Sequence, residues 1–64
     1  DKLSVILGLI SSMEKETGMV EKTRLLERLQ TEYDIGSSEA ERLIGQMLKE
    51  GTVFSPRNGY LKKT

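Results

Sequence analysis

Side chains able to bind a phosphate backbone or stack on a base gather near the C-terminus of this sequence. Residues 51–64 carry three cations and no acid, a net charge of +3, whereas residues 1–50 carry seven basic and ten acidic side chains, a net charge of −3. Attraction to a polyanion is therefore concentrated in the C-terminal segment. Its candidate contact residues are Phe54, Arg57, Asn58, Tyr60, Lys62 and Lys63. A second interpretation stays open, in which the aromatic residues stiffen a hairpin and the lysines confer solubility.

A second candidate group follows helical spacing. Arg42, Gln46 and Lys49 recur at i, i+4 and i+7. On the outer face of a helix, they would meet phosphates and base edges if that helix entered a groove of DNA. The flanking acids, which would repel phosphates, are Glu39, Glu41 and Glu50. Mixed charge on a solvated helix face is the more ordinary explanation.

Catalytic chemistry has little support. The sequence contains no His and no Cys, so the usual base and nucleophile pairs and thiolate metal sites are missing. Acids two positions apart on a helix, as at Glu14 and Glu16, point in different directions. The run 36–38, Gly-Ser-Ser, lacks the Gly-Lys-Ser/Thr core of a phosphate loop. We therefore expect no enzyme activity, metal or cofactor site in this chain.

Apolar periodicity predicts three helices, over residues 2–17, 21–33 and 38–50. Asp1 is the expected N-cap of the first helix and Gly18 its end. The apolar stripe of this helix consists of Leu3, Ile6, Leu7, Ile10 and Met13. Val5 and Leu9 widen that stripe, either because the helix is wedged between two others or because these residues dock on a neighbouring domain. Ser38 and Glu41 fit a capping box for the third helix.

The C-terminal segment predicts a β-hairpin with a five-residue loop, 55–59. That loop places Phe54 opposite Tyr60 and Val53 opposite Leu61. Val53 and Leu61 are expected to pack on the helices, leaving the two aromatic residues half exposed. The dipeptide at 19–20, Met-Val, is expected to add one β-bridge to the hairpin's edge.

This order of elements is that of a winged helix-turn-helix, a mainly α fold with three helices plus a two- to three-stranded wing. The 64 residues make a single domain, 1–64, too small for a deep cleft. No apolar run reaches the length of a membrane span, and the lack of Cys favours an intracellular origin. Since the chain does not begin with Met and is helical from the start, we expect it to be a piece of a larger protein.

The run from Leu48 to Tyr60, Leu-Lys-Glu-Gly-Thr-Val-Phe-Ser-Pro-Arg-Asn-Gly-Tyr, resembles the end of archaeal MCM replicative helicases. In that family, a helix ends in Gly and leads through an apolar-aromatic pair to a Pro-Arg-x-Gly-Tyr wing. The upstream Gly18-x-Val20 element and the leucine-rich second helix are also similar, so the resemblance covers nearly the whole chain.

The resemblance implies a C-terminal accessory module, tethered behind the ATPase domain of a hexameric DNA-unwinding motor that works on chromosomal DNA in the cytoplasm. ATP and Mg would belong to that ATPase domain, outside this chain, so no catalytic residue carries over. The module would tune ATPase and unwinding activity and contact origin-loading proteins or DNA. In isolation it would be a monomer with weak or no DNA binding.

A function of another class stays open, the DNA-binding winged helix of a transcription regulator. It would use Arg42, Gln46 and Lys49 together with the basic wing. The zero net charge and a pI of about 6.5 weigh against strong DNA binding by this domain alone.

Overall fold

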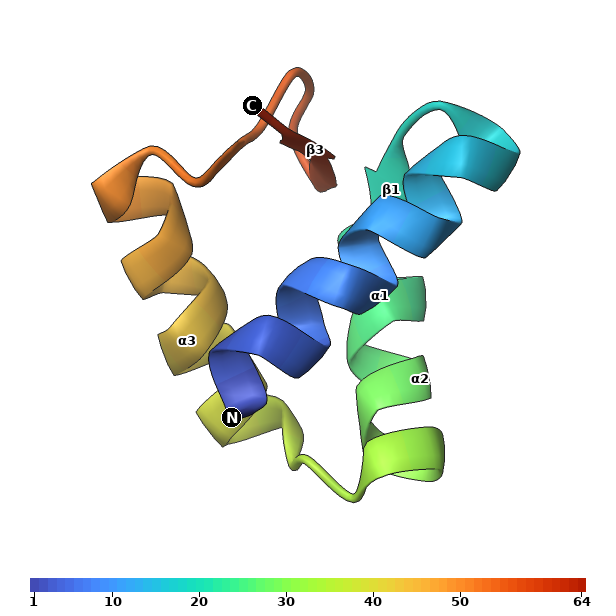
Figure 1. Ribbon diagram of the computed structural model, residues 1–64, viewed down its shortest axis with the longest axis vertical. Coiled ribbons are helices and arrows are strands. Elements are labelled where there is room, and N and C mark those ends of the chain that lie inside the picture. Colours follow the sequence, from blue (N-terminus) through green and yellow to red (C-terminus); the bar gives the residue numbers. More distant parts are fainter.

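Three helices form the body of the molecule. The computed structural model describes residues 1–64 and contains α1 (Lys2–Thr17), α2 (Lys22–Tyr33) and α3 (Ser37–Glu50). Figure 1 shows α1 crossing in front of α2 and α3, which also pack on each other, with a small sheet at one end of the bundle. The predicted fold class, three helices with a small antiparallel sheet in a winged-helix-like arrangement, is confirmed. None of the helices has the length and apolar character needed to cross a bilayer.

Residues next to the helices mark where α1 begins and where all three helices end. The Asp1 carboxylate accepts a hydrogen bond from the Ser4 N–H (2.8 Å), which makes Asp1 the predicted N-cap of α1. Gly18 (φ 86°) and Gly51 (φ 81°) end α1 and α3 in conformations that glycine adopts without strain. Asp34 (φ 55°) ends α2 in the left-handed region, which Asp tolerates better than most residues.

The predicted capping box at Ser38 and Glu41 is wrong. The helix α3 begins one residue earlier, at Ser37, and its N-cap is Gly36, with no side-chain hydrogen bond to the cap. Ser38 therefore lies within the first turn. The Glu41 carboxylate turns instead toward Lys22 on α2, at 3.1 Å.

The sheet has three antiparallel strands in the order β1-β3-β2. They are β1 (Val20–Glu21), β2 (Val53–Phe54) and β3 (Tyr60–Lys63). The strand β1 is the predicted bridge, displaced by one residue, and it adds a third strand to the sheet. The main-chain N–H of Lys22 donates to the Gly59 carbonyl (2.9 Å), so the start of α2 is tied to the end of the wing loop.

The predicted hairpin register is wrong by two residues. Phe54 lies opposite Lys62 and Val53 opposite Lys63. The reason is that β3 is shared: its first two residues pair with β1, Tyr60 with Glu21 and Leu61 with Val20, before β3 meets β2. Because the slip is an even number of residues, every side chain keeps its face of the sheet.

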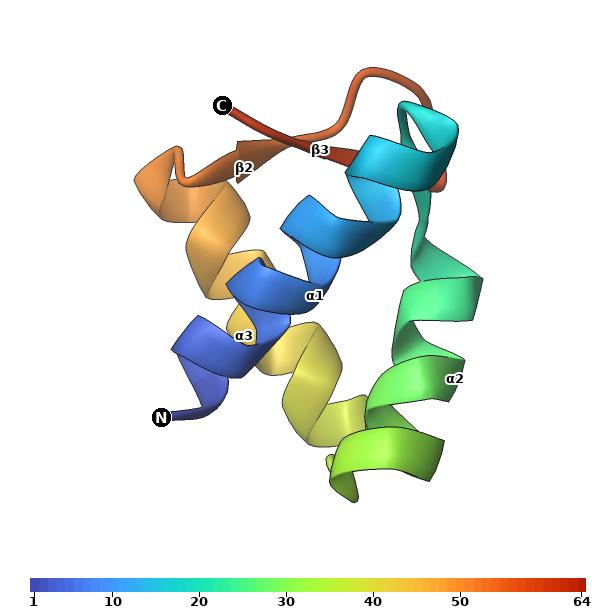
Figure 2. The same cartoon turned by 45° about the vertical axis from the view of Figure 1, so that its right-hand side comes forward.

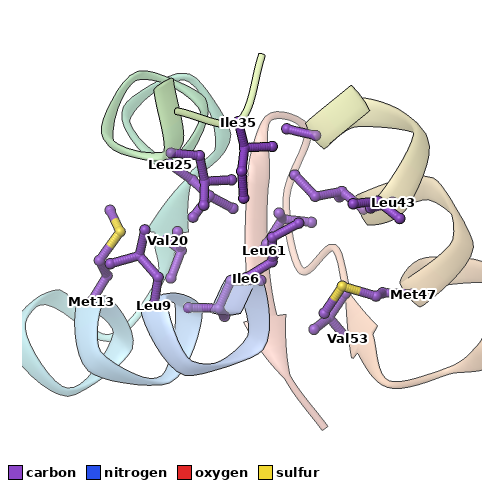
Figure 3. Packing of buried hydrophobic residues seen from close by; sticks show 14 residues of the cluster. Ile6, Leu9, Met13, Val20, Leu25, Ile35, Leu43, Met47, Val53 and Leu61 are labelled. Carbon is purple, nitrogen blue, oxygen red and sulfur yellow. The ribbon is translucent and has the colours of Figure 1, made fainter. Parts of the chain in front are cut away.

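The core consists of 14 apolar residues, with no buried polar side chain among them. Figure 3 shows these side chains meeting between the helices and the inner face of the sheet. Val53 (1% exposed) and Leu61 (2%) fasten the wing to this core, as predicted. Leu9 is also buried, so it belongs to the core rather than to a docking surface, whereas Val5 is only half-buried.

Candidate interaction surface

The nine candidate residues fall on two surfaces formed by different elements. Arg42, Gln46 and Lys49 lie on the exposed side of α3. The other six belong to the wing, by which we mean residues 53–63, two strands and the loop between them. The charged side chains of the two surfaces have different partners within the molecule.

On α3, the three flanking acids are all engaged within the molecule. The Glu39 carboxylate pairs with the Lys2 ammonium (2.8 Å) and Glu41 with Lys22 (3.1 Å). The third, Glu50, accepts a hydrogen bond from the Gln46 side-chain amide at 3.3 Å.

Arg42 and Lys49 form no salt bridge. Between them, Gly45 is exposed, and a side chain built there would meet nothing within 4 Å. The face of α3 is thus an open surface whose cations are free and whose acids are partly neutralised. Gln46 is held by Glu50, so a base-reading role for its amide requires that bond to break.

The wing loop is stabilised by its own hydrogen bonds. The Arg57 carbonyl accepts from the Ser55 hydroxyl (2.6 Å) and from the Tyr60 N–H (3.0 Å). Asn58 is exposed in this loop, followed by Gly59 at φ 84°. These contacts give the loop a defined shape, which Figure 2 shows arching away from the sheet.

The two aromatic residues of the wing do not form the predicted facing pair. Tyr60 is half-buried, and the Arg57 guanidinium lies over its ring, 5.5 Å from the centroid, in a cation–π contact. Phe54 lies opposite Lys62 and is 43% exposed. The wing therefore presents one open aromatic side chain, Phe54, and one covered by a cation.

Glu14 on α1 fastens the far end of β3. Its carboxylate accepts the Lys63 N–H (2.9 Å) and pairs with the Lys62 ammonium (3.5 Å). Lys63 follows Leu61 by two residues and so directs its N–H toward β1, which is too short to reach it. The backbone hydrogen bond from Lys63, with the charge of Lys62, lowers the pKa of Glu14 from its ordinary value. The side chain of Lys63 remains exposed at the end of the strand.

A pocket of about 230 Å³ opens beside Tyr60, between the end of α1, β1 and the first turns of α2. Its lining residues are Met13, Glu16, Thr17, Met19, Glu21, Arg24, Arg28 and Tyr60. On α2, the Arg28 guanidinium binds Glu32 (3.0 Å), and this hydrogen bond raises the pKa of Arg28. A smaller hollow of about 130 Å³ lies between the start of α1 and the end of α3.

Sequence reasoning missed both the Glu14 contact and this pocket. Arg24 and Arg28 have the ordinary pattern of a solvated helix face, and Glu14 is separated from Lys63 by 49 positions. No local pattern reports such contacts. Nowhere in the molecule do three or more His, Cys, Asp or Glu side chains come together as ligands of a metal ion would. A scan against protein-family models and a search of curated proteins find no match to this chain.

Proposed function

We propose that this domain is an accessory protein-docking module, carried at the C-terminus of a hexameric MCM-type replicative helicase, where it regulates ATP hydrolysis and unwinding. The observation that carries the docking role is Phe54, a large aromatic side chain left 43% exposed on a sheet that is itself anchored to the core. Apolar side chains presented on a rigid element are favoured contacts between proteins. The resemblance of the wing and helices to the archaeal MCM C-terminus supplies the helicase context.

The charge distribution favours protein over DNA at the wing. DNA affinity rises with the number of phosphates neutralised by Lys and Arg. Of the wing's three cations, Lys62 is paired with Glu14 and Arg57 lies against Tyr60. Only Lys63 is without an internal contact of its side chain. A chain of zero net charge adds no long-range attraction to a polyanion.

Nucleotide chemistry would belong to other domains of the helicase. No cluster of acidic side chains here suits a Mg ion, and the Gly-Ser-Ser run at 36–38 simply starts α3. By the resemblance to MCM helicases, ATP and Mg would act through the ATPase domain. In this proposal, the partners of the module are that domain and proteins that load the helicase on chromosomal DNA.

The proposal is tested in the full-length protein. Deleting residues 1–64 is expected to change the rate of ATP hydrolysis or unwinding without preventing assembly. Phe54→Ala should reproduce part of that change. Tyr33→Ala is the matched control, because Tyr33 is similarly exposed (47%) but lies at the end of α2. Unchanged kinetics and partner binding in the deletion would refute the regulatory role.

A second candidate function, DNA binding by the winged helix of a transcription regulator, is favoured by one observation on α3. The acids beside Arg42 and Lys49 are engaged by Lys2, Lys22 and Gln46. DNA binding through this face predicts weaker fluorescence-anisotropy binding of a duplex by Arg42→Gln and Lys49→Gln, with a shallower salt dependence. An unchanged isotherm in both variants would exclude it.

A further inference from the structure

The pocket beside Tyr60 joins two parts of the chain that are distant in sequence, residues 13–28 and the start of β3. Met13 from α1, Met19 from the turn before β1 and Tyr60 from β3 supply its apolar surface, and Arg24 and Arg28 stand one turn apart on α2. Figure 2 shows the end of α1, the start of α2 and the wing loop meeting on this side of the molecule.

The size and lining of the pocket fit a side chain rather than a cofactor. Its volume of about 230 Å³ is below the roughly 300–1,000 Å³ of typical small-molecule pockets. Methionine thioethers are flexible and polarizable, and they adapt their shape to an incoming apolar group. Met13 and Met19 are thus suited to receive one large apolar side chain of another molecule.

The charges around the pocket leave one cation without a partner. Arg28 is neutralised by Glu32 and lies within the field of Glu16. Glu16 and Glu21 form no salt bridge, and Glu21, the N-cap of α2, makes no side-chain cap hydrogen bond. Arg24 also lines the pocket, but it forms no salt bridge. An acidic group on the incoming molecule would complement it.

We propose that this pocket binds a segment of a partner protein that carries a large apolar side chain and, within a few positions of it, an Asp or Glu. The apolar side chain occupies the space between Met13, Met19 and Tyr60, and the carboxylate pairs with Arg24. This inference rests on the proposed docking function and names the chemistry of the partner. It places the partner's contact beside the wing loop, on a surface distinct from Phe54.

A nucleic acid fits the pocket less well. The Tyr60 ring already has the Arg57 guanidinium over it, at 5.5 Å, which hinders stacking of a base on that face. Glu16 and Glu21 belong to the same lining and would repel a phosphate backbone. A peptide places only one negative group, opposite Arg24.

The three methionines of the chain provide the readout. In the 64-residue protein labelled with ¹³C at the methionine methyls, Met13 and Met19 report on the pocket, and Met47, buried at the other end of the core, is the internal control. The probe is a pool of short capped peptides in a Gly/Ser/Gln background, each with one Leu, Phe or Met and one nearby Asp. A twin pool carries Asn in place of Asp, and a short oligothymidine serves as the nucleic-acid probe.

We expect saturable shifts of the Met13 and Met19 methyl signals with the Asp pool, and no shift of Met47. The Asn pool should bind about two- to fivefold more weakly, which is the effect of one exposed ion pair. Arg24→Gln should weaken binding of the Asp pool by the same factor and leave the Asn pool unaffected. Arg42→Gln, which removes an unpaired cation from α3, is the matched control and should change neither.

Three results would overturn the inference: no shift at Met13 and Met19, equal binding of both pools, or saturation by oligothymidine instead of peptide. These results leave the Phe54 experiment untouched. Loss of helicase regulation in Phe54→Ala with no peptide binding would refute the pocket alone. Peptide binding with normal kinetics in the deletion would refute the regulatory role alone.

Discussion

The α3 face and the wing both carry exposed cations, but only the α3 face has acids of its own beside them. On α3, Glu39 and Glu41 are engaged by cations from α1 and α2, so Arg42 and Lys49 remain free. On the wing, Glu14 from α1 engages Lys62 and Arg57 lies against Tyr60, so the exposed ring of Phe54 and the Lys63 ammonium remain. What a surface offers a partner is therefore decided by side chains that reach it from elsewhere in the fold. A count of the charged residues in one segment therefore does not tell which of those side chains are left unpaired.

The largest expected effect is a loss of stability, which should be greater for a leucine of β3 than for a leucine of α3. Leu61→Ala removes a side chain that is 2% exposed and is expected to lower the free energy of unfolding by about 3 kcal/mol, from lost burial and a cavity. Leu48→Ala, the same change at a residue of α3 that is 38% exposed, should cost less than about 1 kcal/mol. Urea denaturation of both variants measures the difference. Equal losses would mean that Leu61 does not anchor the wing.

Replacing a glycine by alanine should have opposite effects on stability at Gly45, on the exposed face of α3, and at Gly51, in the turn before the wing. Gly45→Ala is expected to raise the free energy of unfolding by up to about 1 kcal/mol, because alanine favours the helix and a Cβ there meets nothing within 4 Å. Gly51→Ala should lower it by about 1 kcal/mol, because φ is 81° at that position. Thermal unfolding measures both. Destabilisation by Gly45→Ala would show that the α3 face is not open.

A smaller loss of stability is expected when Glu41 on α3 loses the cation that it pairs with. Lys22→Met leaves Glu41 without its cation, and because the pair is partly exposed, we expect a loss of less than about 1 kcal/mol. Any DNA binding by the α3 face should also weaken, since the freed carboxylate repels phosphate. Unfolding curves and duplex binding at two salt concentrations test these effects, with Lys15→Met, an unpaired exposed lysine of α1, as the control.

The most local effect is the pH response of the wing's fastening. Glu14 has a folded-state pKa below its ordinary value of 4.5, so its stabilising contribution is complete above that value and is lost as the pH falls through the lowered pKa. The amide chemical shift of Lys63 should therefore titrate with a midpoint below 4.5. In Glu14→Gln this titration should disappear. A midpoint at or above 4.5 in the unmodified protein would show that the contact does not persist in solution.

Local signals were sufficient to predict the helices and their order. Asp1, Gly18 and Gly51 each act within one helix end, and the apolar stripe of α3 fixes its buried face. The burial of Val53 and Leu61 was also predictable, because alternation along a strand survives a two-residue error in register. These features depend only on neighbouring residues.

The errors involve contacts between distant segments. The register depends on β1 taking the first half of β3, and Glu41, expected to take part in the cap of α3, pairs instead with Lys22 of α2. The candidate contact residues were chosen by type, and their availability depends on Glu14, Lys2 and Lys22. Sequence periodicity contains no information on such partners.

The proposed docking role requires that the wing offer Phe54 to a partner protein while Lys62 stays paired with Glu14 and Arg57 stays against Tyr60. Titration of the ¹⁵N-labelled chain with duplex DNA at low salt tests it most directly. We expect no saturable shift at Phe54, Arg57 or Lys62, whether or not the α3 residues shift. Saturable shifts at those wing residues that fade steeply as salt is added would contradict it.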